Sequence, residues 1–110
     1  MSALYVMRYV GQTGTGGGVM YVGKGIVAGM DAGGNRYDGS YNETGGRLRG
    51  RVTMSVQAGT VLVTGQVVPQ AAHFEIRIDW PADFDNGRPQ QVSVAGRLAA
   101  VSFEKLKDIP

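Results

Sequence analysis

A chain of 110 residues, 43% of them hydrophobic, is long enough for one domain with its own core and too apolar for a disordered tail. The absence of cysteine excludes disulfides, thiolate nucleophiles and thiolate metal sites, and a formal charge of +2 is too small to indicate nucleic acid by itself. Glycine, with 18 residues, exceeds the usual share of roughly 7% more than twofold, which favours β structure with tight turns and bent strands.

Apolar residues alternate with polar or small ones along most of the chain, in runs bounded by Gly, Asn, Asp or Pro. This pattern is typical of half-buried antiparallel strands. In chain order, the expected strands are Ala3–Val10, Gly18–Val22, Ile26–Asp31, Arg36–Asn42, Arg47–Gln57, Thr60–Val68, His73–Trp80 and Gln91–Leu98. Ala99–Lys107 either continues the last of these past a bulge or forms a short final strand. Turns or loops are expected at Gly11–Gly17, Gly23–Gly25, Ala32–Asn35, Thr44–Gly46, Ala58–Gly59 and Pro81–Pro89.

The alternation also predicts which side chains face the interior. In the longest strand, the inward set is Leu48, Gly50, Val52, Met54 and Val56. In the two strands after Pro69, it is Phe74, Ile76, Ile78 and Trp80, followed by Val92, Val94 and Leu98.

About eight short strands at regular spacing predict an all-β fold, specifically a small antiparallel up-and-down barrel that occupies residues 1–110 as one domain. Glycines expected at strand centres favour the sharp bending that a barrel requires. These glycines are Gly29, Gly39, Gly50, Gly65 and Gly96.

Large side chains are expected in the interior of this barrel, namely Tyr5, Met7, Tyr21, Met54, Phe74 and Trp80. They either fill the interior, for which an eight-stranded barrel has just enough room, or line a cavity that accepts an apolar or lipid-like ligand.

An arginine stripe, Arg47, Arg49 and Arg51, is expected on the outer face of the longest strand. Guanidinium groups on a rigid sheet can bind phosphates or carboxylates, but outward charges on strands also keep a barrel soluble. Because no basic and aromatic RNA-binding motif accompanies the stripe, nucleic acid is not the expected partner.

Catalytic and metal-binding patterns are missing from the sequence. His73 is the single histidine, and the glycine-rich loop Gly11–Gly18 runs into a strand pattern, not into the helix that a phosphate-binding loop needs. We therefore expect no enzyme activity and no cofactor. Residues 1–10 do not resemble a signal peptide, and no run approaches the ~18 apolar residues of a membrane helix, so a cytoplasmic protein without membrane attachment is expected.

Several short motifs resemble the GrlR-like family, named for a negative regulator of type III secretion gene expression in bacteria. They are Leu4-Tyr5, the turn Gly23-Lys24-Gly25, the triplet Gly29-Met30-Asp31 and the segment Tyr37-Asp38-Gly39-Ser40-Tyr41. The resemblance covers the first half of the chain, to about Val56, while the second half agrees in strand pattern.

This resemblance implies a small lipocalin-like barrel that forms a homodimer, holds an apolar molecule and regulates through contacts with a protein partner. The matching partner-binding loop consists of Asn42, Glu43 and Thr44, of which Glu43 alone is acidic. A non-enzymatic regulatory or binding module is therefore the expected function. The alternatives are a carrier of a small apolar or lipid-like ligand and a binder of anions or nucleic acid through the arginine stripe.

Overall fold

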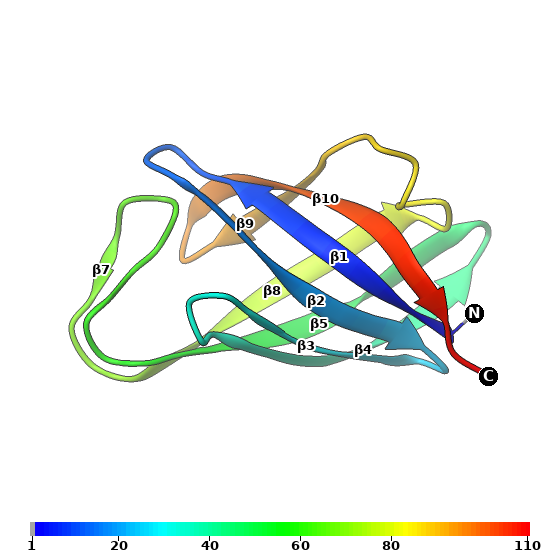
Figure 1. Cartoon of the computed structure of the whole chain (residues 1–110), viewed down its shortest axis with the longest axis horizontal. Coiled ribbons are helices and arrows are strands. Elements are labelled where there is room, and N and C mark those ends of the chain that lie inside the picture. The colour runs from blue at the N-terminus through cyan, green and yellow to red at the C-terminus, as the bar shows by residue number, and fades with distance from the viewer. Residues whose placement is uncertain (1) are drawn as a thin grey trace.

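Ten strands and no helix make up the part of the chain that the computed structural model describes, residues 2–110. The strands are β1 (Ser2–Val10), β2 (Thr15–Gly23), β3 (Ile26–Asp31), β4 (Arg36–Thr44), β5 (Arg47–Val56), β6 (Thr60–Val61), β7 (Val67–Val68), β8 (Ala72–Pro81), β9 (Gln90–Val94) and β10 (Arg97–Asp108). Figure 1 shows both termini at one end of the molecule and the β6–β7 hairpin at the other. Within residues 2–110, no helix is long and apolar enough to cross a membrane.

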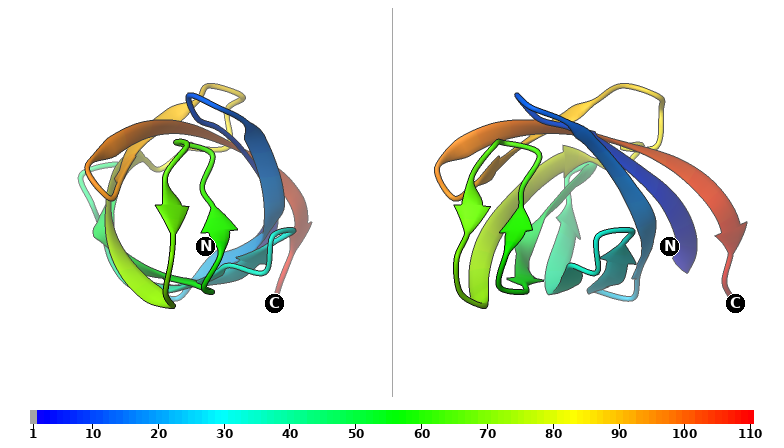
Figure 2. Two further views of the ribbon diagram at one scale, coloured as in Figure 1. Left: turned by 90° about the vertical axis from the view of Figure 1, so that its left-hand side faces the viewer. Right: turned by 60° about the vertical axis from the view of Figure 1, so that its left-hand side comes forward.

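Eight of the strands form one antiparallel sheet in the order β8-β5-β4-β3-β2-β1-β10-β9. Strand β1 pairs with both β2 and β10, and this pairing brings the two ends of the chain together and curls the sheet round. Within residues 2–110, no backbone ladder joins β8 to β9, so one seam of the barrel stays open. Figure 2 shows the resulting ring from its end. The predicted all-β, up-and-down barrel of about eight strands is confirmed.

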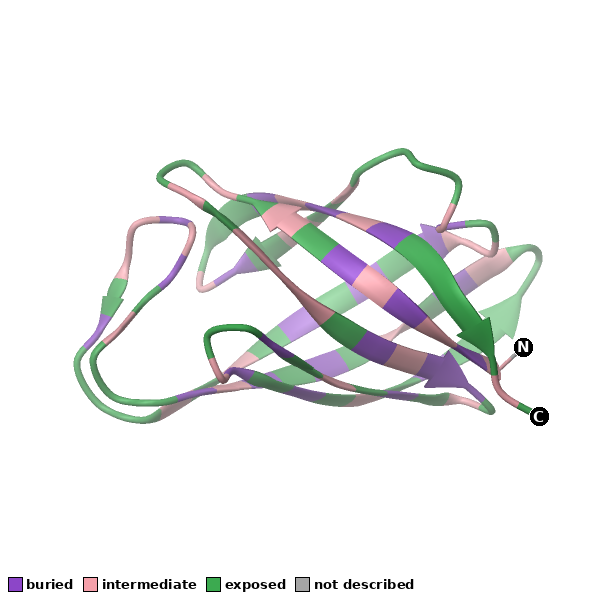
Figure 3. Cartoon of the chain, in the orientation of Figure 1, coloured by how far each residue is buried: buried purple, intermediate pink, exposed green. Residues whose placement is uncertain are grey.

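Burial alternates along the strands as the hydrophobic pattern predicts, which Figure 3 shows as alternating colours along the ribbon. On β5, Leu48, Val52, Met54 and Val56 are buried and the arginines between them are not. Since successive side chains of a strand point to opposite faces, each strand contributes one row of apolar side chains to a shared interior. The core lies inside the barrel.

Two of the expected strands are instead hairpins. The segment Thr60–Val68 turns back on itself at Gly65, whose φ of 89° and bond from its amide to the Leu62 carbonyl define a tight turn. Likewise Gln91–Leu98 is broken at Ala95 and Gly96, both at positive φ, so β9 and β10 are separate antiparallel strands. A single Gly within an alternating run looks the same in sequence whether it bends a strand or ends it.

The second of these turns explains one wrong prediction about burial. Leu98 was expected to face inward with Val92 and Val94, but it is 66% exposed. The two-residue turn restarts the alternation, so that Ala99, Val101 and Phe103 of β10 face the interior instead. Gly65 and Gly96, expected at strand centres, are therefore turn residues.

Gly29, Gly39 and Gly50 do lie within strands, on the inner face of β3, β4 and β5. A Cβ at Gly39 would overlap the carbonyl oxygen of Arg51, and one at Gly50 would overlap that of Ser40. Neighbouring strands approach these positions so closely that only glycine fits. This part of the sheet can therefore bend sharply enough to close the ring.

Candidate functional site

A cavity of about 410 Å³ occupies the inside of the barrel. Apolar side chains from seven of its strands line most of it, including Met7, Met20, Val52, Ile76 and Val101. Protein interiors ordinarily contain few voids larger than a water molecule, whereas small-molecule sites have volumes of about 300–1,000 Å³. The volume and the apolar lining are those of a ligand site.

The end of the barrel near the termini is closed by four rings, Tyr5, Trp80, Phe84 and Phe103, which we call the aromatic plug. Their centroids lie 4.9 Å apart for Tyr5 and Phe84, 5.0 Å for Trp80 and Phe103, and 5.2 Å for Phe84 and Phe103. These are favourable separations for aromatic pairs. Phe84 comes from the loop after β8 and is fully buried, so it stabilises this end by filling it.

The other end is covered by residues 60–68, which we call the cover hairpin and which lie across the open ring in Figure 2. Its residues Thr60, Leu62 and Thr64 are among those that line the cavity. Four hydrogen bonds tie it to neighbouring segments. The amide and the hydroxyl of Thr13 donate to the Val63 carbonyl at 2.9 and 3.1 Å, Arg97 Nη1 donates to the Thr64 carbonyl at 3.4 Å, and Gln66 Nε2 donates to the Ala95 carbonyl at 3.3 Å.

A hydrogen-bonded cluster around the carboxylate of Asp31 lies at the covered end. Asp31 is 4% exposed and ends β3, and Asn35 and Tyr37 follow across the turn into β4. Oδ2 of Asp31 accepts bonds from the hydroxyls of Tyr9 (2.9 Å) and Tyr37 (2.8 Å) and from Asn35 Nδ2 (3.0 Å). Oδ1 accepts from the backbone amides of Gly33 (2.9 Å) and Asn35 (3.1 Å). Five donors therefore compensate the burial of this carboxylate.

The same cluster changes the acidity of its two tyrosines. Burial, and then the hydrogen bond to Asp31, raises the pKa of Tyr37 and that of Tyr9 far above the ordinary value of 10.0. Ionising either phenol would place a second negative charge beside the carboxylate. Both hydroxyls therefore remain neutral donors across the physiological pH range.

Among residues 2–110, two buried polar side-chain atoms have no hydrogen-bond partner, Asn35 Oδ1 and Trp80 Nε1, and both belong to residues that line the cavity. Asn35 is 6% exposed and Trp80 is 7% exposed. Native proteins leave few such groups, and each unpaired one costs about 1–3 kcal/mol. Neither atom has surface that even a water molecule can reach, so both groups are unsatisfied within the packed wall of the barrel and not exposed to the lumen.

The predicted interior residues fall into three groups. Met7, Met54 and Trp80 line the cavity, while Tyr5 belongs to the aromatic plug. Phe74 packs against the core and also lines a second, shallower pocket at the open seam, with Ser93 and Gly96. Tyr21 does not face the interior, because its neighbours Met20 and Val22 do; its hydroxyl instead lies 2.8 Å from Ser2 Oγ.

The arginine stripe lies on the outer face, as predicted, but carboxylates of β8 are interleaved with it. Asp79 Oδ1 lies 2.7 Å from Arg47 Nε and 3.3 Å from Arg49 Nε, and Glu75 Oε1 lies 3.7 Å from Arg51 Nε. The hydrogen bond from Arg47 lowers the pKa of Asp79. These exposed ion pairs partly neutralise the stripe and weaken it as an anion site.

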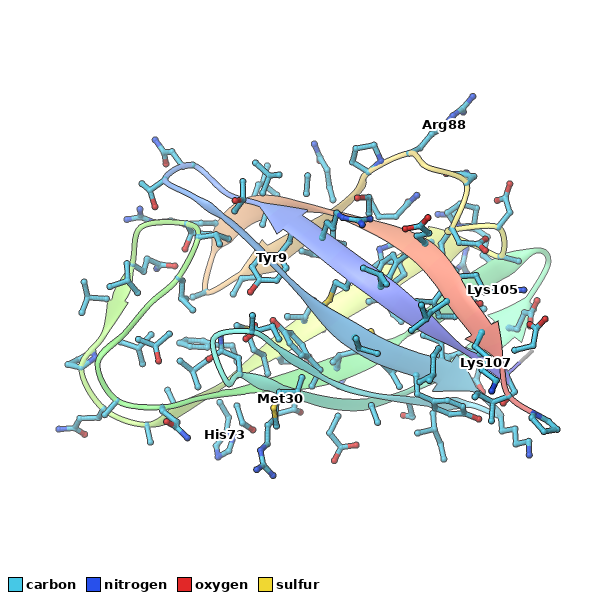
Figure 4. All side chains as sticks on the ribbon, in the orientation of Figure 1. Tyr9, Met30, His73, Arg88, Lys105 and Lys107 are labelled. Atoms are coloured by element: carbon cyan, nitrogen blue, oxygen red, sulfur yellow. The ribbon has the colours of Figure 1, made fainter. Side chains whose placement is uncertain are left out.

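The loop residues Asn42, Glu43 and Thr44 are all exposed at the end of β4. A separate exposed set of apolar side chains lies on the outer face of β2 and β3: Val19, paired in register with Met30, and Ile26. Figure 4 shows Met30 pointing away from the barrel.

Three buried residues at the ends of the barrel interior were not predicted from the sequence. Phe84 was read as part of a polar loop, since a single aromatic between Asp83 and Asp85 shows no strand pattern. Asp31 and Asn35 were read as strand end and turn. Asp31 lies on the same face of β3 as Val27 and Gly29, which face inward. This two-residue spacing alone predicts that its carboxylate is buried.

Comparisons of the chain with protein-family models, with curated proteins and with solved structures found no match. The cavity geometry is therefore the basis for the functional conclusion.

Proposed function

We propose that this protein is a non-enzymatic binding protein that holds one small apolar molecule inside its barrel. The observation that supports this most directly is the cavity of about 410 Å³ between the aromatic plug and the cover hairpin. Large side chains already occupy one end of the barrel, yet those of the middle and the covered end leave this volume open. At about 24 cal/mol per Å³, a cavity of this size in a purely structural core would reduce stability by roughly 10 kcal/mol, so a ligand is the simplest account of it.

Access to the cavity is through the covered end in this proposal. The aromatic plug packs densely, whereas the cover hairpin pairs through strands only two residues long and lies outside the eight-stranded sheet. Segments outside the main sheet open more easily than its strands. Displacing residues 60–68 exposes the lumen without breaking the main sheet.

The experiment is a titration of the protein with Nile red, a neutral dye that fluoresces in apolar surroundings. Ala99 is buried on the inner face of β10 and lines the cavity, and its neighbour Ala100 faces the opposite side of the sheet. We expect saturable binding to the wild type and to Ala100→Phe, and its loss in Ala99→Phe, whose ring fills the lumen. Equal binding by the two variants places the dye outside the barrel and contradicts the proposal.

A second proposal, from the resemblance to GrlR-like regulators, is a homodimer that contacts a regulatory protein. The exposed pair Val19 and Met30, with Ile26 farther along β3, supplies an apolar surface that a protein contact would cover. Light scattering tests the dimer, with Met30→Lys expected to shift the mass toward the monomer. A monomeric mass for the wild type at high concentration rules out this arrangement.

A further inference from the structure

The connections between the strands fall at the two ends of the barrel, because neighbouring strands are antiparallel. Figure 1 shows four of them at the covered end, away from the two termini. None of their residues is charged, and we call them together the uncharged cap: residues 11–14, 32–35, 57–71 and 95–96. At the end with the aromatic plug, by contrast, the connections contain Lys24, Asp83, Asp85 and Arg88.

The outer surface of the uncharged cap is apolar. On the cover hairpin, Val61 and Val67 lie directly opposite each other in register and are 65% and 64% exposed. Val61 is also one of the residues that line the cavity. The exposed apolar surface of the uncharged cap therefore extends into the lumen.

Two more exposed apolar side chains lie beside the uncharged cap. Val10 ends β1 and is 54% exposed, and Leu98 near the start of β10 is 66% exposed. Because Val10 pairs with Ala100, Leu98 is its diagonal neighbour on the outer face. Arg97, the residue before Leu98, donates to the Thr64 carbonyl of the cover hairpin. These side chains therefore extend the apolar surface onto the wall of the barrel.

Exposed cations border the uncharged cap. Arg36 directly follows residues 32–35, and Arg97 directly follows residues 95–96. Within the described part of the chain, neither arginine takes part in an ion pair. Asp31, the carboxylate that directly adjoins the uncharged cap, is buried and already accepts five hydrogen bonds. Both guanidinium groups are thus available to an anion outside the barrel.

This combination of an apolar centre and a cationic border fits a lipid surface. Exposed apolar patches mark sites of contact with proteins or membranes. At a membrane interface, apolar side chains enter the acyl region, while arginines beside them reach the level of the headgroups and attract anionic lipids. A bilayer is also a medium in which apolar molecules dissolve, and the cavity opens toward the same end of the barrel.

We infer that the covered end of the barrel docks on a lipid bilayer that contains anionic headgroups. Val61 and Val67 enter the acyl region, and Arg36 and Arg97 lie at the level of the phosphates. Such attachment is peripheral and needs no spanning helix, so a search for long apolar runs does not predict it. Docking goes beyond the proposed function: it gives an apolar ligand a direct route from the bilayer to the lumen.

Co-sedimentation with lipid vesicles tests the docking surface without any dye or ligand. Vesicles of phosphatidylcholine alone are compared with vesicles in which phosphatidylglycerol replaces part of it. We expect binding to the mixed vesicles to be about 10-fold tighter than to the neutral ones, because each arginine at the surface gains a few-fold from anionic headgroups. Absence of binding to both kinds of vesicle overturns the inference.

A pair of variants with the same change of charge locates the apolar contact. Val67→Asp places a carboxylate in the uncharged cap, and Ile26→Asp places one at a residue that is 50% exposed at the start of β3, beside the opposite end. Binding to mixed vesicles is expected to fall at least about 10-fold in Val67→Asp and less than about twofold in Ile26→Asp. Equal losses show that net charge decides, and contradict docking through the uncharged cap.

A second pair tests the cationic border. Arg97→Gln is expected to reduce the preference for mixed over neutral vesicles about fivefold. Arg88→Gln, at a residue that Figure 4 shows pointing away from the barrel, is expected to leave the preference unchanged. A preference that Arg97→Gln and Arg88→Gln reduce equally contradicts the role of Arg97.

The remaining outcomes separate docking from ligand binding. A protein that binds vesicles but not Nile red retains the docking surface and loses the proposed function, whereas one that binds Nile red but no vesicles retains the proposed function alone. Light scattering that shows a dimer lost in Val67→Asp, together with no vesicle binding, assigns the uncharged cap to a second copy of the chain and overturns the inference.

Discussion

The hydroxyl of Tyr37 donates a 2.8 Å hydrogen bond to the carboxylate of Asp31, a buried charge at the covered end of the barrel. The bond joins the first residues of β4 to the end of β3 and fixes the turn that carries Asn35. The cluster therefore stabilises the covered end of the barrel.

Tyr37→Phe keeps the ring and removes the donor. We expect it to lower the free energy of unfolding by about 1.5–3 kcal/mol, the range for hydrogen bonds to charged groups. Urea denaturation measures the change. Tyr21→Phe is the matched control, because its hydroxyl meets a neutral Ser2 on the outer face, and about 1 kcal/mol or less is expected there. Equal losses in both variants contradict the special role of the Asp31 cluster.

The raised pKa values of Tyr9 and Tyr37 predict a loss of stability at alkaline pH. Both groups stay protonated in the folded state above 10.0, where they ionise in the unfolded chain. The folded state then binds more protons than the unfolded state, so stability is full below pH 10 and falls as the pH rises beyond it. Urea midpoints measured from neutral pH upward check this, with tyrosinate absorbance reporting the ionisation. In Tyr37→Phe the loss of stability with rising pH should be smaller than in the wild type. An identical loss shows that ionisation of Tyr37 does not contribute to it.

Gly39→Ala is expected to destabilise the barrel by about 1–3 kcal/mol, because the added methyl overlaps the Arg51 carbonyl of the neighbouring strand and forces the two apart. Gly14→Ala has nothing within 4 Å of the new Cβ and should change stability by less than about 0.5 kcal/mol. Thermal unfolding of the two variants side by side gives the comparison. A tolerated Gly39→Ala shows that sharp bending at this point is not required.

Locking the cover hairpin should slow ligand exchange. The chain has no cysteine, so the double variant Thr13→Cys, Val63→Cys forms a single bridge between neighbours whose backbones are already hydrogen bonded. Stopped-flow measurement of Nile red release is expected to show a rate reduced more than about 10-fold in the oxidised form, as lid opening is required for exit. Reduction of the same protein is the control and should restore the wild-type rate. Unchanged release from the oxidised form means that the ligand leaves by another route, such as the open seam.

Sequence patterns predicted the barrel because a period of two is visible in every long strand, from the inward row of β5 to that of β8. They did not distinguish a glycine that bends a strand, such as Gly39, from one that ends it, such as Gly65, since that difference lies in how the neighbouring strands pack. Phe84 was missed for a similar reason: a single aromatic in a polar loop becomes core only because the open barrel end beside it accepts a ring. The unpartnered atoms of Asn35 and Trp80 depend on side-chain geometry that no periodicity encodes.

Native mass spectrometry of the full chain incubated with myristyl alcohol tests the central claim most directly. One alcohol molecule per protein chain is the predicted complex, retained by Ala100→Phe and lost by Ala99→Phe. A wild-type spectrum that shows the free protein alone, or an Ala99→Phe spectrum that still carries the alcohol, would contradict a ligand held inside the barrel.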